Sequence, residues 1–150
     1  MHRSILRPIL VATLVCGTLD ILLAIILTVW RGREIGGMLR FVASGPFPAA
    51  TEMGAAGSAL GLAVHFTLMG LMVAVLVIAA RALPFLLDKP WVSGLLYGLI
   101  TYAVFDLIVV PMRFPTAWPP STLSVTTQLF AHIALVGWPT AFITRRYSRG

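Results

Sequence analysis

Four long runs of apolar residues follow one another along the chain, separated by segments that hold most of the charges and prolines. The runs cover about residues 5–30, 57–80, 91–112 and 126–143. A helix needs about 20 apolar residues to cross the hydrocarbon of a bilayer. Because lipid offers no hydrogen bonds, a spanning segment has to satisfy its own backbone groups, which favours helices. The pattern predicts an all-α fold: one integral membrane domain over residues 1–150, built as a bundle of four transmembrane helices.

The first connection is the longest, and it has an apolar pattern of its own. Met38, Leu39, Phe41 and Val42 lie close together within residues 36–45. In a short amphipathic helix these side chains would dip into the membrane interface. The alternative is an irregular loop rich in glycine and proline, and the sequence leaves both open.

Composition supports a membrane protein and argues against a nucleic-acid surface. The chain is 59% hydrophobic and 11% charged, whereas roughly 25% of the residues of a soluble domain are charged. The net charge is +6, but the sequence has no basic run with interleaved aromatic residues of the kind that grips nucleic acid. We therefore expect the lipid bilayer, and no nucleic acid, as the partner of this surface.

The basic residues are distributed unevenly between the two ends of the expected helices. Seven lie at the N-terminus, in the second connection or at the C-terminus, and four lie in the first and third connections. The first group is Arg3, Arg7, Arg81, Lys89, Arg145, Arg146 and Arg149, and the second is Arg31, Arg33, Arg40 and Arg113. Since basic residues are enriched on the cytoplasmic side, both termini are expected there.

Each apolar run carries one ionisable residue away from its ends: Asp20, His65, Asp106 and His132. At 1.5 Å per helical residue, all four fall in the same half of the bilayer, on the side opposite the termini. Ionisable residues are costly in hydrocarbon and usually mark pathways or sites. We therefore expect one polar cluster between the helices.

Small residues recur at four-residue spacing on the faces that carry these groups, most clearly at Gly57, Gly61, Gly94 and Gly98. Such spacing lets membrane helices approach closely, so the ionisable side chains should face other helices rather than lipid. Tyr102 and Gln128 are close enough in sequence to donate hydrogen bonds to the cluster.

Three interpretations of the cluster remain open. It can hold the helices together in a purely structural subunit, or it can handle protons or ions, bind a small ligand or assist a membrane complex. It can also bind a metal or haem in an oxidoreductase that uses His65 and His132, with Asp106 and Asp20 as further metal ligands. The sequence contains no glycine-rich phosphate loop, nucleophile elbow or HExxH motif, which favours a non-enzymatic role. A homo-oligomer or a larger membrane complex is compatible with all three.

Several short segments carry a family resemblance. They are "GTLD" (17–20), "LRFVASG" (39–45), "LGLAVHF" (60–66), "GLLYG" (94–98), "VVP" (109–111) and "AHIALVGWPTAFITRR" (131–146). They resemble a group of small bacterial membrane proteins, and the last three helices look like the YagU-like inner-membrane family. The similar elements there include histidines at the places of His65 and His132 and a proline like Pro111. The resemblance implies a bacterial inner-membrane location and four helices, and it implies no reaction.

Overall fold

The computed structural model describes residues 4–149, and the described part of the chain is helical and contains no strand. The α-helices are α1 (Leu6–Trp30), α2 (Ile35–Ser44), α3 (Gly54–Ala82), α4 (Pro90–Val104), α5 (Val110–Arg113), α6 (Thr122–Phe130) and α7 (Trp138–Arg149). Two π-helical segments, η3 (Phe105–Val109) and η5 (Ala131–Gly137), join α4 to α5 and α6 to α7 without a break. Single 3₁₀ turns occupy Pro48–Glu52, Pro84–Leu87 and Pro115–Ala117.

Three helices are long and apolar enough to cross a membrane: Leu6–Trp30, Gly54–Ala82 and Pro90–Arg113. Each contains one of the first three expected spans almost completely. The fourth expected span, residues 126–143, lies inside the continuous helical run 122–149, which is not among these three. Its hydropathy is lowered by polar residues such as Gln128 and His132.

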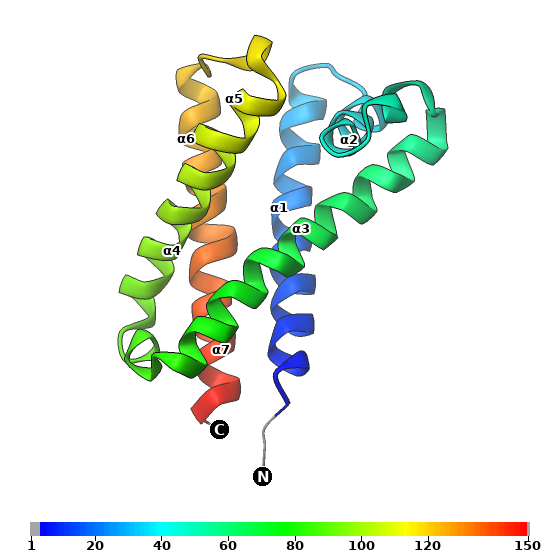
Figure 1. Ribbon diagram of the computed structural model, residues 1–150. Helices are drawn as coiled ribbons and strands as arrows, with labels where there is room; N and C mark the ends of the chain where they lie inside the picture. The colour runs from blue at the N-terminus through cyan, green and yellow to red at the C-terminus, as the bar shows by residue number, and fades with distance from the viewer. Residues whose placement is uncertain (1–3, 150) are drawn as a thin grey trace.

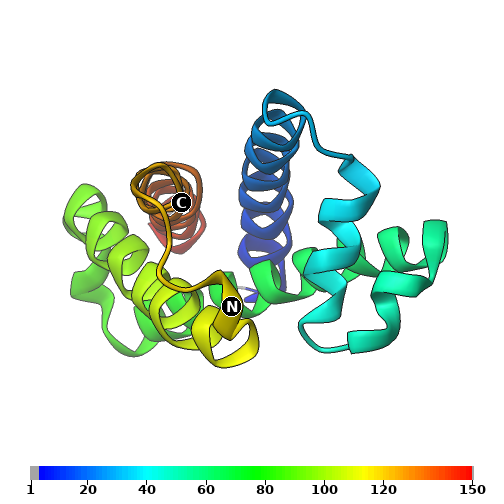
Figure 2. The same cartoon turned by 90° about the horizontal axis from the view of Figure 1, so that it is seen from above.

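The long helical runs alternate in direction, and the first and last helices bring the two ends of the chain to the same end of the molecule (Figure 1). The run formed by α6, η5 and α7 lies between α4 and α1 when the molecule is seen from above (Figure 2). It packs against α1, α3 and α4. The last run is therefore the central element of the bundle, although it is the least apolar.

Apolar side chains point outward as well as inward. Leu10, Leu14 and Leu71 are each 61% exposed, while Cys16 and Val73 are fully buried. Exposed leucines at this density suit a surface that meets lipid, and the small buried residues let the helices approach.

The first connection contains a helix, α2, rather than an irregular loop throughout. It packs closely on α3 because α3 has glycines at the contact. A Cβ on Gly61 would lie 1.9 Å from the carbonyl oxygen of Leu39, and one on Gly57 would lie 2.2 Å from that of Ala50. These two glycines therefore pack against the first connection rather than against a neighbouring long helix.

Both π-helical segments end two residues before a proline, Pro111 and Pro139. Proline has no N–H, and its ring clashes with the carbonyl four residues earlier. A helix that continues through a proline therefore opens locally, and a wider π turn is one way to do so. The sequence signals these irregularities by its prolines alone.

Candidate functional site

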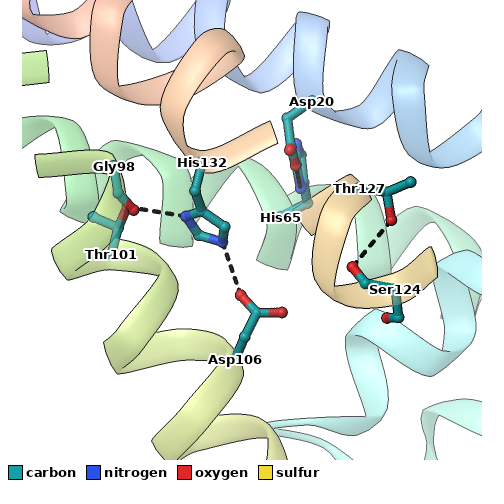
Figure 3. Close-up of polar contacts among 8 residues, drawn as sticks. All are labelled: Asp20, His65, Gly98, Thr101, Asp106, Ser124, Thr127 and His132. Carbon is teal, nitrogen blue, oxygen red and sulfur yellow. Dashed lines mark hydrogen bonds and ion pairs between the residues drawn. The ribbon is translucent and has the colours of Figure 1, made fainter. Parts of the chain in front are cut away.

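The four ionisable residues of the long helices form two separate Asp–His pairs (Figure 3). His132 Nε2 lies 3.0 Å from Asp106 Oδ2, and His65 Nδ1 lies 3.9 Å from Asp20 Oδ2. The first pair joins η5 to η3, and the second joins α3 to α1. Asp20 is also close enough to both members of the other pair to interact with them electrostatically. The sequence shows that four such residues exist, whereas the pairing depends on the order of the helices around the bundle.

The Asp106–His132 pair forms where two helices come unusually close. A Cβ on Gly98 would lie 2.6 Å from the carbonyl oxygen of His132. One turn away, a Cβ on Gly94 would lie 2.9 Å from the carbonyl oxygen of Gly137. Glycine is needed at these contacts because any side chain would separate the backbones. The close approach brings the His132 ring within hydrogen-bonding distance of Asp106.

Thr101 is a third member of this site, and it was not predicted. Its hydroxyl lies 3.0 Å from the carbonyl oxygen of Gly98 and 2.9 Å from Nδ1 of His132. With Asp106 at Nε2, both ring nitrogens of His132 therefore have protein partners. Thr101 itself is 5% exposed. A threonine in an apolar run gives little warning of this role, because it can equally bond its own helix.

The second pair is looser and is anchored to the backbone. His65 Nε2 lies 2.9 Å from the carbonyl oxygen of Gly17, and a carbonyl can only accept, so this nitrogen carries the proton. The distance of 3.9 Å from Nδ1 to Asp20 is too long for a direct hydrogen bond. His65 therefore ties α3 to α1 chiefly through Gly17.

Asp106 lies on the wall of a cleft of about 520 Å³. The end of α1, α2, η3, α6 and the connection between α5 and α6 all contribute to it. Its polar and aromatic lining includes Arg31, Arg33, Tyr102, Asp106, Trp118 and Gln128. The volume suits a small molecule, since ligand pockets span roughly 300–1,000 Å³. One carboxylate oxygen of Asp106 faces His132, and the other points away from the imidazole (Figure 3).

Tyr102 and Gln128, proposed above as hydrogen-bond donors to the cluster, take other positions. Tyr102 presents its ring edge-on to His132, with the ring centroids 6.1 Å apart. Both residues line the cleft, and within residues 4–149 neither side chain makes a hydrogen bond to the four ionisable residues. They are therefore wall residues of the cleft.

The geometry does not gather a metal-ligand set. Within residues 4–149, no group of three or more His, Cys, Asp or Glu side chains is placed to hold a metal ion. A metal or haem iron at His132 would have to displace Thr101 or Asp106, and one at Nε2 of His65 would have to displace the Gly17 carbonyl. The residues present fit a hydrogen-bonded site better than a cofactor site.

Comparison with family models, with curated proteins and with solved structures found no match for this chain. Its function is therefore inferred from the site itself.

Proposed function

We propose that this chain is a four-helix integral protein of a bacterial inner membrane, with both termini in the cytoplasm and α2 as an amphipathic helix in the interface. Three apolar helices support this proposal, as does the return of the helical run 122–149 to the end where the chain starts (Figure 1). The exposed leucines and the distribution of basic residues agree with it. Similarity to the YagU-like family is part of the same proposal.

The activity in this proposal is non-enzymatic. The Asp106–His132 pair takes up and releases a proton, and the adjoining cleft binds a small ligand in step with that change. The observation that carries it is the 3.0 Å contact between Asp106 and His132, together with the position of Asp106 in the lining of the cleft. Histidine is the side chain that ordinarily changes charge near neutral pH, and an ionisable pair between membrane helices is a default candidate for a site.

Counting the protons at the Asp106–His132 pair shows what the loss of one proton does to its hydrogen bonds. The Thr101 hydroxyl has one hydrogen. If it donates to the Gly98 carbonyl, it must accept from Nδ1–H of His132. The contact between Nε2 and Asp106 then holds one proton, whether that proton resides on the ring or on the carboxyl. When it leaves, two acceptors face each other at 3.0 Å.

The pair can recover from that loss by one rotation. If the Thr101 hydroxyl turns from the Gly98 carbonyl to donate to Nδ1, the remaining ring proton moves to Nε2 and restores the bond to Asp106. Release of a proton is thereby coupled to the tautomer of His132 and to the hydroxyl direction of Thr101. No helix has to move for this exchange.

The Asp20–His65 pair has the structural role in this proposal. Its firm contact is the hydrogen bond from His65 Nε2 to the Gly17 carbonyl, which links α3 to α1. Interhelical bonds of this kind contribute about 0.6–2 kcal/mol in membranes. The two interpretations of the cluster as helix-holding and as proton-handling thus apply to different pairs.

The test is ¹⁵N NMR of the detergent-solubilised full chain with ¹⁵N-labelled histidine, titrated from about pH 5 to pH 8. The signal of His132, assigned by its loss in H132Q, should change protonation state within this range. It should also respond to T101V, which removes the hydroxyl partner of Nδ1.

H65Q is the matched control, since it removes the other intramembrane histidine and should leave the titration of His132 unchanged. A His132 signal that keeps one protonation state over the whole range, in wild type and T101V alike, would exclude proton handling at this pair.

A further inference from the structure

Two arginines border the cleft without a partner of their own. Arg31 and Arg33 are exposed and line both the cleft and a neighbouring hollow of about 360 Å³. Within residues 4–149, neither guanidinium makes a hydrogen bond or ion pair. Arg40 and Arg113, on the same side of the molecule, are both engaged. Arg40 lies 3.7 Å from Glu34, and Arg113 donates to the carbonyl oxygens of Ser44 and Gly45.

The backbone that carries the two arginines is fixed. The N–H of Arg33 bonds the carbonyl of Thr28 at 2.9 Å, and that of Gly32 bonds Val29 at 2.9 Å. Gly32 has φ +66°. These two bonds, one of them donated by a left-handed glycine, form the Schellman motif that ends a helix. The turn places two basic side chains beside one cleft, where both are available to a single anionic group.

The rest of the lining suits a ligand that combines an anionic group with hydrogen-bonding groups and apolar surface. Trp118 and Phe41 supply apolar surface, while Tyr102, Gln128 and Asp106 supply hydrogen-bonding groups to the same lining. Trp30 and Trp118, near the same end of the bundle, are residues that favour the headgroup layer.

We infer that the cleft binds a phosphate ester, with Arg31 and Arg33 on the phosphate and a hydroxyl or ammonium of the same ligand near Asp106. Guanidinium forks match phosphate oxygens and bind them with charge-assisted hydrogen bonds. The inference deepens the proposed function, because it names the ligand class of the cleft beside the Asp106–His132 pair. The same chemistry is available from a membrane phospholipid and from a soluble phosphate ester.

Two binding measurements on delipidated full-length protein in detergent distinguish these sources. Native mass spectrometry follows phosphatidylglycerol against diacylglycerol, which lacks the phosphate. Calorimetry follows glycerol 3-phosphate against glycerol. Saturable binding of one phosphatidylglycerol supports a lipid head group, and saturable binding of glycerol 3-phosphate supports a soluble ester.

The decisive variant is R31Q/R33Q, compared with R145Q/R146Q at the other end of the bundle, which changes the net charge equally. The first should weaken phosphate binding at least about tenfold, equivalent to 1.4 kcal/mol, and the second less than about twofold. Absence of saturable binding to either phosphate probe, or equal weakening by both double variants, would overturn the inference.

The histidine titration keeps this result separate from the proposed function. If the His132 signal changes protonation state in wild type and in R31Q/R33Q alike, and wild type binds no phosphate probe, only the ligand inference fails. If wild type binds phosphate through the two arginines and His132 never titrates, only the proton-handling proposal fails.

Discussion

The imidazole of His132 lies 3.0 Å from the carboxylate of Asp106, and each residue stands in a π-helical segment that ends two residues before a proline. π turns inside α-helices occur frequently at functional sites. Here the wider turns coincide with a close helix contact of the site, at Gly98. The pair thus lies where two irregular turns pack against each other. Substitutions can test the hydrogen bonds, the glycine contact and the proline that hold it in place.

The two Asp–His pairs should differ in coupling energy. A double-mutant cycle of D106N with H132Q should give a coupling of about 1–2 kcal/mol, because the two groups touch and are largely shielded from solvent. A cycle of D20N with H65Q should give less than about 0.5 kcal/mol, because their atoms are 3.9 Å apart. Equilibrium unfolding in mixed detergent micelles measures both. Equal couplings would contradict the division of roles between the pairs.

Thr101 should matter through its hydroxyl and not through its size. T101V keeps the shape but leaves Nδ1 of His132 without a partner, which should destabilise the protein by about 1–3 kcal/mol. T101S restores the hydroxyl and should recover most of that stability, and the His132 ¹⁵N signal should recover with it. Loss of stability in T101S equal to that in T101V would indicate that packing of the methyl group decides instead.

The helices were largely predictable from the sequence, because their signals are local. The expected run 5–30 became Leu6–Trp30, and 91–112 became the helical stretch Pro90–Arg113. For the first connection the sequence allows either a helix or a loop, and α2 forms at Ile35–Ser44. Apolar length, proline positions and glycine spacing each depend on a few neighbouring residues, so they can be read from one chain.

The site was only partly predictable, because its geometry depends on helices that are distant in sequence. Four ionisable residues could be named, but the separation into Asp106–His132 and Asp20–His65 depends on which helices are neighbours. Thr101 looked like any helical threonine. In the sequence, Arg31 and Arg33 are only markers of orientation, since nothing local shows that they border a cleft.

Gly98→Ala should disturb the site from the backbone side. An added Cβ would lie 2.6 Å from the His132 carbonyl oxygen and 2.7 Å from Cα of Ile133, and both are backbone atoms that cannot turn aside. Overpacking of this kind costs about 1–3 kcal/mol, and relief requires α4 and η5 to separate. We expect a lower unfolding midpoint in detergent and a changed His132 ¹⁵N signal.

Gly37→Ala in α2 is the control for that experiment. Its nearest neighbour would be Cβ of Glu34 at 3.8 Å, which is ordinary contact, and alanine favours helix over glycine by about 1 kcal/mol. Gly37→Ala should therefore leave the unfolding midpoint unchanged or raise it. A Gly98→Ala protein as stable as this control would show that the close approach at Gly98 is dispensable.

Pro139→Ala should separate the shape of the site from the stability of the helix. Alanine restores an N–H that can bond the carbonyl of Leu135, so η5 can tighten to a regular α-helix. Closing a π turn changes the register by one residue, which is a rotation of about 100° at 3.6 residues per turn. Beyond this turn, Thr140 is fully buried and its hydroxyl lies 3.3 Å from the Cys16 thiol. Because these contacts hold the helix in place after η5, we expect the part of the helix that carries His132 to rotate.

His132 should then leave Asp106, although the helix itself gains a hydrogen bond and loses a clash. We expect an unfolding midpoint close to that of wild type, because the gain within the helix offsets the loss of the pair. The His132 ¹⁵N signal should no longer respond to D106N. Pro90→Ala is the control, because Pro90 opens α4 at a position where proline suits a helix. Wild-type coupling of His132 to Asp106 in Pro139→Ala would mean that packing against Gly98, rather than the proline, holds the π turn open.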